Sequence, residues 1–186
     1  MAKTLLTFGD SNTHGTPPMT TPDDNDRYGV GTRWPTVTHA ALGSGWTLIE
    51  EGLGGRTATP LPHPVNGDHL GGPIGLRIAL LSHKPVDVLT IMLGTNDKQT
   101  CYGQTSASVT ASMAGLLTIA KSPDIARRHP GMDILLICPQ PSLESGIFAD
   151  SLMGAAQNFV DLPAYYAALA AHWNIGFLDA GRHISS

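Results

Sequence analysis

The 186-residue chain is long enough for one domain with a sizeable core, and its 41% hydrophobic and 14% charged residues are typical of a folded protein. A formal net charge of −4, with no basic cluster beyond Arg127-Arg128, argues against nucleic-acid binding, which needs a basic face. No stretch reaches the ~20 apolar residues of a membrane span, no signal peptide is recognisable, and two cysteines make no disulfide framework, so we expect a cytoplasmic protein without a membrane partner.

Short apolar runs alternate with longer helical patterns along the chain. Five strands are predicted, at 3–8, 46–50, 86–93, 132–138 and 175–178. Helices are predicted at 34–43, 73–84, 109–120 and 159–173. In the last of these, Pro163 marks a kink or a helix start, and Asp161 is the candidate cap. This alternation predicts an α/β fold with a parallel, doubly wound sheet.

Two long segments, 12–32 and 57–73, are rich in Gly, Pro, Asp and Thr and are predicted to be loops. Both follow the carboxyl ends of predicted strands, which is where open α/β sheets bind ligands. Loops of this length in a compact domain are usually functional, so we expect the site at this edge of the sheet.

The first candidate motif is Gly9-Asp10-Ser11-Asn12, which ends the first predicted strand abruptly. It places the Ser11 hydroxyl at the carboxyl end of that strand, where a serine can be an exposed nucleophile. Asp10 is a candidate for holding the turn by local hydrogen bonding. Taken alone, the motif is explained equally well by a plain turn, because all four residues are ordinary turn formers.

The second motif, Glu51-Gly52-Leu53-Gly54-Gly55-Arg56-Thr57, directly follows the second predicted strand. Its glycines let the backbone approach a ligand closely, and we expect the Gly55 N–H to point into the crevice. A tight turn that merely needs glycine is one alternative. A dinucleotide fingerprint is another, although Thr57 stands where the third glycine belongs. Arg56 is a candidate for anchoring the loop or contacting substrate.

The third motif is Leu93-Gly94-Thr95-Asn96-Asp97, at the end of the third predicted strand. Asn96 can offer a side-chain N–H₂ donor to a ligand at the same sheet edge. Asp97 cannot donate when it is ionised, so we expect it to anchor the loop backbone.

In order and spacing, these three motifs resemble three of the four blocks of the SGNH hydrolases, also called GDSL-type esterases. Within that superfamily the chain is similar to the bacterial arylesterases and acetylesterases over nearly its whole length. The resemblance implies a three-layer α/β/α flavodoxin-like sandwich with a five-stranded parallel sheet. It also implies that Ser11 is the nucleophile, that Ser11 N–H, Gly55 N–H and the Asn96 side chain form the oxyanion hole, and that no metal or cofactor is needed.

The fourth family block, Asp-x-x-His, supplies the base histidine and its orienting aspartate, and it opens the last helix of the family fold. No such block follows the fifth predicted strand here. Asp179-Ala-Gly-Arg-His183 has the right residue types but one residue too many, so we do not expect His183 to be the base. We expect residues 1–186 to be one SGNH-hydrolase domain lacking its catalytic loop and last helix; a naturally shortened relative is the alternative.

The leading hypothesis is a serine esterase that hydrolyses short-chain acyl esters, acetyl or aryl, through an acyl-enzyme. Its substrate would be a small-molecule ester such as an acetylated carbohydrate. One alternative is an inactive relative that binds esters or carbohydrates, and another is a nucleotide-binding protein that uses the Gly52–Gly55 turn. The low charged fraction and the resemblance to oligomeric relatives favour a homo-oligomer.

Overall fold

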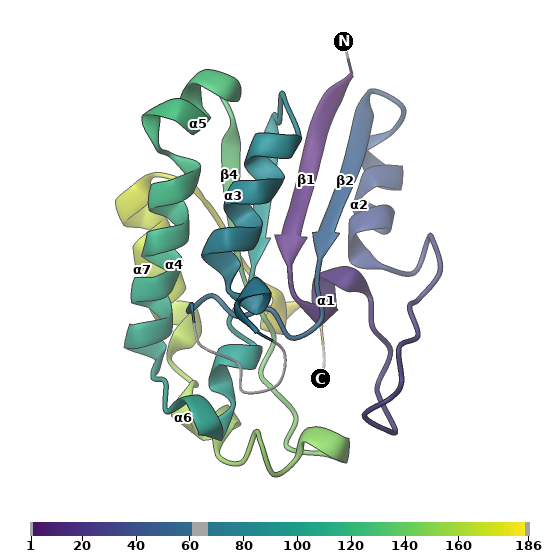
Figure 1. The fold of residues 1–186 in the computed structure, drawn as a ribbon, viewed down its shortest axis with the longest axis vertical. Coiled ribbons are helices and arrows are strands. Elements are labelled where there is room, and N and C mark those ends of the chain that lie inside the picture. Colours follow the sequence, from purple (N-terminus) through teal and green to yellow (C-terminus); the bar gives the residue numbers. More distant parts are fainter. Residues whose placement is uncertain (1, 61–66, 185–186) are drawn as a thin grey trace.

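In the computed structural model, which describes residues 2–60 and 67–184, five parallel strands form one sheet between helical layers (Figure 1). The strands are β1 (Lys3–Gly9), β2 (Trp46–Gly52), β3 (Val88–Met92), β4 (Asp133–Cys138) and β5 (Gly176–Asp179). The five predicted strands and the fold class are therefore confirmed. The third strand is shorter than predicted because the N–H of Val86 donates to the His129 ring instead of to a neighbouring strand.

The strand order β2-β1-β3-β4-β5 places β1 at a topological switch point. β1 pairs with β2 on one side and with β3 on the other, so the chain leaves it in one direction and later returns in the opposite one. In such sheets a crevice opens at the carboxyl ends of the two strands that flank the switch. The loops after β1 and β3, which carry the first and third motifs, meet at this crevice.

One face of the sheet is covered by α3 (Gly72–Ser82), α4 (Ser106–Ala120) and α7 (Leu162–Trp173), which pack against one another in this order (Figure 1). Side chains alternate between the two faces of a strand, and those facing these helices, such as Leu6 and Phe8, are fully buried. The main hydrophobic core therefore lies between the sheet and these three helices.

The opposite face carries α2 (Trp34–Leu42) and, at the carboxyl edge, the short α1 (Ser11–His14). Its core is smaller: Met92 and Ile137 are buried, with Trp34 packed against them. Beside this cluster the sheet borders an open groove of about 560 Å³. The two faces are thus covered unequally, and the groove reaches the sheet edge where the first motif lies.

The remaining helical segments are short. They are α5 (Pro123–Arg128), α6 (Ala155–Asn158) and the 3₁₀ turns η1 (Asp68–Leu70), η2 (Asn96–Lys98), η3 (Thr100–Tyr102), η4 (Gly146–Phe148) and η5 (Ala180–Arg182). Within the described ranges, no helix combines the length and the apolar character needed to cross a bilayer.

The last predicted helix shows how tertiary contacts set an element's boundary. The apolar stripe begins at Phe159, but α7 starts at Leu162 with Pro163 in its first turn. Asp161 occupies the N-cap position, yet its carboxylate accepts a hydrogen bond from the Ser106 hydroxyl at 2.5 Å and caps no helical N–H. The carboxylate therefore joins α7 to the start of α4. The predicted loop 57–73 contains η1 and the start of α3, and its residues 61–66 lie outside the described residues.

Replacing Tyr166 by Phe should lower the free energy of unfolding by about 1–2 kcal/mol. The Tyr166 ring is fully buried, and its hydroxyl donates to the Leu93 carbonyl at 3.1 Å, so the change leaves a buried carbonyl without this partner. Urea unfolding of the wild type and the variant would measure the loss. Tyr165→Phe, at a neighbouring position that is 41% exposed, is the matched control. Equal unfolding midpoints for the two variants would contradict this account.

Candidate active site

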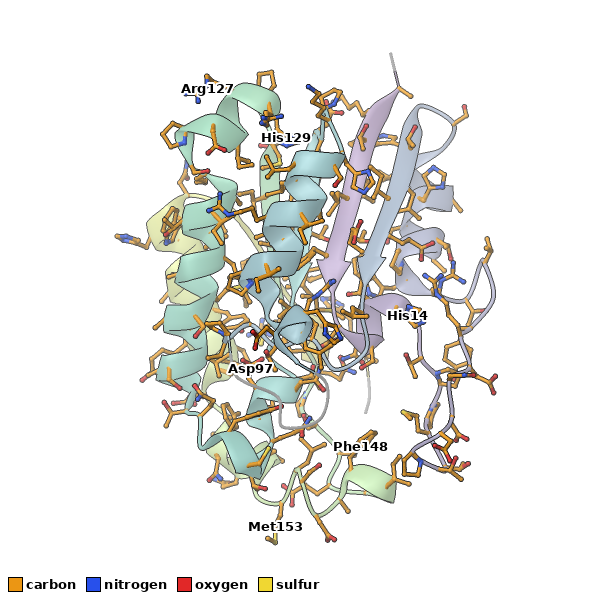
Figure 2. The ribbon with its side chains drawn as sticks, in the orientation of Figure 1. His14, Asp97, Arg127, His129, Phe148 and Met153 are labelled. Carbon is orange, nitrogen blue, oxygen red and sulfur yellow. The ribbon has the colours of Figure 1, made fainter. Side chains whose placement is uncertain are left out.

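The three motifs follow β1, β2 and β3, the three neighbouring strands at one side of the sheet. Because these strands are parallel, their carboxyl ends lie at one edge, and so do Ser11, Gly55 and Asn96. Figure 2 places Asp97 and His14 at this edge, whereas Arg127 and His129 lie at the opposite end of the sheet. The fold therefore brings the motifs to a common edge, although they lie far apart in the sequence.

Ser11 is the first residue of α1, directly after a buried aspartate. Asp10 is fully buried and caps the helix: its Oδ1 accepts the Asn12 N–H at 2.9 Å. A side chain at Gly9 could not be accommodated, because a Cβ there would lie 2.1 Å from Thr13 Oγ1. The glycine thus allows the turn to close tightly, and the partly buried Ser11 stands at its apex.

The Gly55 turn presents a free backbone donor. Gly55 has a φ of 79°, a left-handed conformation that favours glycine. Among the described residues, neither the Gly55 N–H nor the Ser11 N–H has a hydrogen-bond acceptor. The turn does not open a helix, since α3 begins only at Gly72. A dinucleotide fingerprint needs a helix directly after its glycines, so the structure does not support the nucleotide-binding alternative.

Asn96 and Asp97 join the loop after β3 to the loop after β2. The Asn96 side-chain amide donates to the Arg56 carbonyl at 2.9 Å, which leaves its second N–H available. Asp97 is fully buried and accepts the N–H groups of Ala58 and Thr59, each at 2.9 Å. Asp97 therefore makes the backbone-anchoring contacts expected of an ionised carboxylate.

A polar residue that sequence reasoning missed lies beside Ser11. The side chain of Gln140 donates to the Asn12 amide oxygen at 3.0 Å, and the Asn12 amide nitrogen donates to the Thr95 hydroxyl at 3.2 Å. Asn12 is thereby held from two sides. Gln140 follows the buried strand β4 almost immediately, and a polar residue in that position was the available signal.

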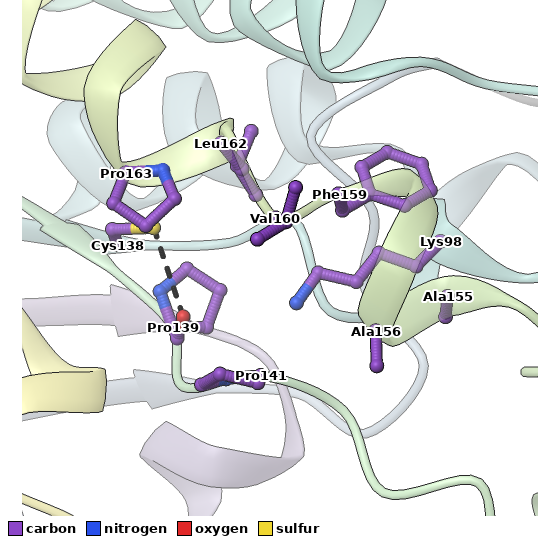
Figure 3. Close-up of a pocket in the computed structure, with 10 residues that line it drawn as sticks. All are labelled: Lys98, Cys138, Pro139, Pro141, Ala155, Ala156, Phe159, Val160, Leu162 and Pro163. Atoms are coloured by element: carbon purple, nitrogen blue, oxygen red, sulfur yellow. Dashed lines mark hydrogen bonds between the residues drawn. The ribbon is translucent and has the colours of Figure 1, made fainter.

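Two cavities border the site. The open groove of about 560 Å³ is lined by Asn12 and by apolar side chains that include Trp34, Met92 and Ile137. A smaller pocket of about 90 Å³ lies beneath Phe159, and Figure 3 shows the Lys98 side chain reaching into it. Lys98 is only 5% exposed, and its Nζ donates to the Gln140 carbonyl at 3.3 Å. The groove, unlike the smaller pocket, is lined by a residue of the first motif, Asn12, which follows Ser11 in the chain.

Among the described residues, no general base is hydrogen-bonded to Ser11, because the Ser11 hydroxyl makes no hydrogen bond to any of them. His183 lines the same groove as Asn12. The carboxylate of Asp179 does not orient the His183 ring, because it accepts the Gly181 N–H at 3.1 Å and pairs with Arg182 at 3.3 Å. The stretch Asp179–His183 therefore does not form a catalytic dyad in this structure.

The described part of the chain contains no cluster of three or more His, Cys, Asp or Glu side chains arranged to hold a metal ion. The N–H groups of Ser11, Gly55 and Asn96 that have no acceptor among the described residues are of the kind that can stabilise a developing oxyanion.

Burial gives Asp10 an unusual proton affinity. Desolvation raises its pKa to about 6, against the opposing effect of the hydrogen bond from the Asn12 backbone N–H. The folded-state pKa thus lies above the value of ~3.9 expected in the unfolded chain. Asp10 therefore contributes stability below about pH 4, and this contribution is lost as the pH rises through about 6.

The variant Asp10→Asn should accordingly flatten the pH dependence of stability between pH 4 and 7. Wild-type protein should lose up to roughly 3 kcal/mol more than the variant over this range, because only the wild type must release the buried proton. Urea unfolding at several pH values would measure both curves. Buried Asp97 remains in both proteins, so the difference isolates Asp10; parallel curves would rule this account out.

The chain is similar to proteins of known family and structure. The model of the GDSL-like lipase/acylhydrolase family matches residues 7–186. Aryl esterase from M. smegmatis, bound to an inhibitor, is 31% identical with a TM-score of 0.91, covering 100% of this chain and 87% of that one. Est24, a carbohydrate acetylesterase from Sinorhizobium meliloti, is 32% identical with a TM-score of 0.90, covering 99% and 86%.

A putative arylesterase from Agrobacterium tumefaciens is also similar, with 32% identity, a TM-score of 0.86 and coverage of 99% and 86%. No similar sequence was found among the curated proteins. The family model spans nearly all of the chain, and the matches extend over the whole sheet and the three motif loops, so the resemblance seen in the sequence is confirmed. The chain belongs to the GDSL-like lipase/acylhydrolase family.

Proposed function

We propose that the protein is a serine esterase that hydrolyses short-chain acyl esters, acetyl or aryl, and that residues 1–186 form one SGNH-hydrolase domain. The observation that carries this proposal is the presence of unused N–H groups on Ser11, Gly55 and Asn96 at the sheet edge that holds the Ser11 hydroxyl. Similarity to an aryl esterase and to a carbohydrate acetylesterase supports the choice of substrate class.

In the proposed reaction, Ser11 Oγ attacks the ester carbonyl carbon while its proton passes to a general base. The carbonyl oxygen becomes an oxyanion that accepts hydrogen bonds from Ser11 N–H, Gly55 N–H and the Asn96 amide. Collapse of the tetrahedral intermediate releases the alcohol and leaves an acyl-enzyme, which water then hydrolyses to the free acid. No described residue occupies the position of the base, and we assign that role to none of them.

The other chemistry-bearing residues would support this geometry. Asp10 holds the nucleophile turn, and Asp97 fixes the loop after Gly55 through two backbone bonds. The groove beside Asn12 would receive the ester, and its apolar wall of Trp34 and Met92 suits an acyl or aryl group better than a charged one.

A second candidate function is an inactive relative that binds esters or acetylated carbohydrates. It is favoured by one observation: within the described residues, the Ser11 hydroxyl has no basic partner. Hydrolysis of 4-nitrophenyl acetate by the protein as its gene encodes it separates the two candidates. Loss of a triad base alone lowers kcat by ~10⁴–10⁶, so turnover well above that residual level favours the enzyme.

We further propose that the protein is a cytoplasmic homo-oligomer. Ile74, Ile78 and Leu81 lie one helical turn apart along α3 and are 50%, 60% and 41% exposed, so they form an apolar stripe on its outer side. Sedimentation of the wild type and of Ile78→Glu would test this: the wild type should be an oligomer, and the variant should be smaller. A monomeric wild type would exclude the homo-oligomer.

Replacing Ser11 by Ala should abolish ester hydrolysis, and replacing Asn96 by Ala should lower kcat by about 10²–10³ through loss of one oxyanion donor. Steady-state kinetics with 4-nitrophenyl acetate would measure both effects. The exposed Asn158→Ala is the matched control and should retain the wild-type kcat. A wild-type rate for Asn96→Ala would remove that residue from the oxyanion hole.

A further inference from the structure

Arg56 is a buried cation without an ion-pair partner among the described residues. Its side chain is only 5% exposed, and the guanidinium carbon lies 4.2 Å from the centroid of the Phe8 ring. Nη1 donates to the Gly9 carbonyl at 2.9 Å and also to the Glu51 carbonyl. Burial lowers the Arg56 pKa to about 10, against the attraction of Glu51 and Asp10, so the group stays charged at neutral pH. Buried arginines are usually paired with carboxylates, so this one calls for an explanation.

The groups that Arg56 binds belong to all three motifs. The Gly9 carbonyl ends β1 two residues before Ser11, and the Glu51 carbonyl lies at the end of β2. The Arg56 backbone directly follows Gly55, and its own carbonyl accepts the Asn96 amide at 2.9 Å. One residue therefore connects the three segments that carry the proposed oxyanion donors.

Helix α3 leaves room for the Arg56 guanidinium because it has a glycine, Gly75, beside it. A Cβ built at Gly75 of α3 would lie 3.2 Å from Arg56 Nη2 and 3.4 Å from its guanidinium carbon. The guanidinium thus occupies the space beside Gly75 that a side chain there would need, and it lies over the ring of Phe8 in the sheet. Both carbonyl bonds come from Nη1, while the plane of the guanidinium lies over the Phe8 ring. A lysine ammonium could donate to a carbonyl, but it has no planar group to stack on the ring.

We infer that Arg56 is a positioning residue, whose guanidinium sets the relative placement of the Ser11, Gly55 and Asn96 donors; this inference rests on the proposed esterase function. Arg56 does not touch the reacting atoms. It acts through the backbone on either side of the donors. Oxyanion donors work only when they are placed to within a fraction of an ångström of the developing charge, so loosening these carbonyl contacts should slow the reaction more than it weakens substrate binding.

The test compares Arg56→Met and Arg56→Lys with the wild type, using 4-nitrophenyl acetate. Arg56→Met keeps an apolar side chain over Phe8 but loses the guanidinium bonds to the Gly9 and Glu51 carbonyls, and it should lower kcat about 10- to 100-fold while KM stays within about threefold. Arg56→Lys retains the charge without the fork and should recover only part of the loss. A kcat for Arg56→Met within about twofold of the wild type overturns the inference.

A matched control separates positioning from stability. His129 is equally buried, and its ring also bonds two backbone groups, Val86 N–H and Leu80 C=O, but at the opposite end of the sheet (Figure 2). His129→Gln should lower the melting temperature and leave kcat unchanged in the folded protein. If the two variants lose kcat equally at equal folded fraction, Arg56 is merely structural.

A second variant keeps the test valid should Arg56→Met fail to fold. Gly75→Ala would ordinarily favour a helix, yet its Cβ presses on the guanidinium. It should therefore lower kcat without lowering the melting temperature by more than His129→Gln does. A kcat equal to that of the wild type counts against the inference.

Amide hydrogen exchange supplies a readout that does not depend on turnover. In Arg56→Met, peptides spanning 51–58 and 94–99 should exchange at least about tenfold faster than in the wild type, and His129→Gln should leave them unchanged. Unchanged exchange overturns the inference. If the wild type hydrolyses no ester but exchange responds as expected, the proposed function fails and the positioning role of Arg56 stands.

Discussion

The two backbone hydrogen bonds to Asp97 are the contacts on which the rest of the site depends. The segment after β2 belongs to no strand or helix, so its buried N–H groups need partners outside the sheet ladder. Asp97, fully buried, accepts two of them, from Ala58 and Thr59. This holds the Gly55 turn against the loop that carries Asn96. Without it, the loops after β2 and β3 would lose two of the hydrogen bonds that join them.

Four buried charges accumulate around this edge, two acidic and two basic: Asp10, Asp97, Arg56 and Lys98. Within the described residues, none of them forms an ion pair, and their hydrogen bonds go to backbone groups. Asp10 Oδ2 and Arg56 Nε are buried without a partner among these residues. Desolvation raises the pKa of both acids and lowers that of both cations. In the proposed reaction, the N–H donors at this edge are already held in place by the folded backbone, so they would need little reorientation when the oxyanion forms.

The sequence predicted the sheet well because its strands are short apolar runs with clear limits. It also predicted that the three polar motifs lie at one edge, because each motif follows one of those runs. It could not predict contacts made by residues distant in the chain. Three such contacts depend on how distant elements pack, which local sequence patterns do not show. They are the hydrogen bond from Ser106 to Asp161, the hydrogen bond from Gln140 to Asn12, and the stacking of Arg56 on Phe8. The short turns and small helices were not predicted for a different reason: they have too few residues to give a periodic signal.

Phe8 packs both in the main hydrophobic core and against the candidate site. Its ring is part of the core between the sheet and the helices, and the guanidinium of Arg56 lies over it. Under the positioning role inferred for Arg56, a core substitution that shifts the Phe8 ring would also displace the guanidinium, and with it the sheet edge that holds Ser11, while the protein still folds. Relatives of this chain would be expected to exchange core residues around Phe8 in compensating groups, because selection on turnover acts there before selection on stability does.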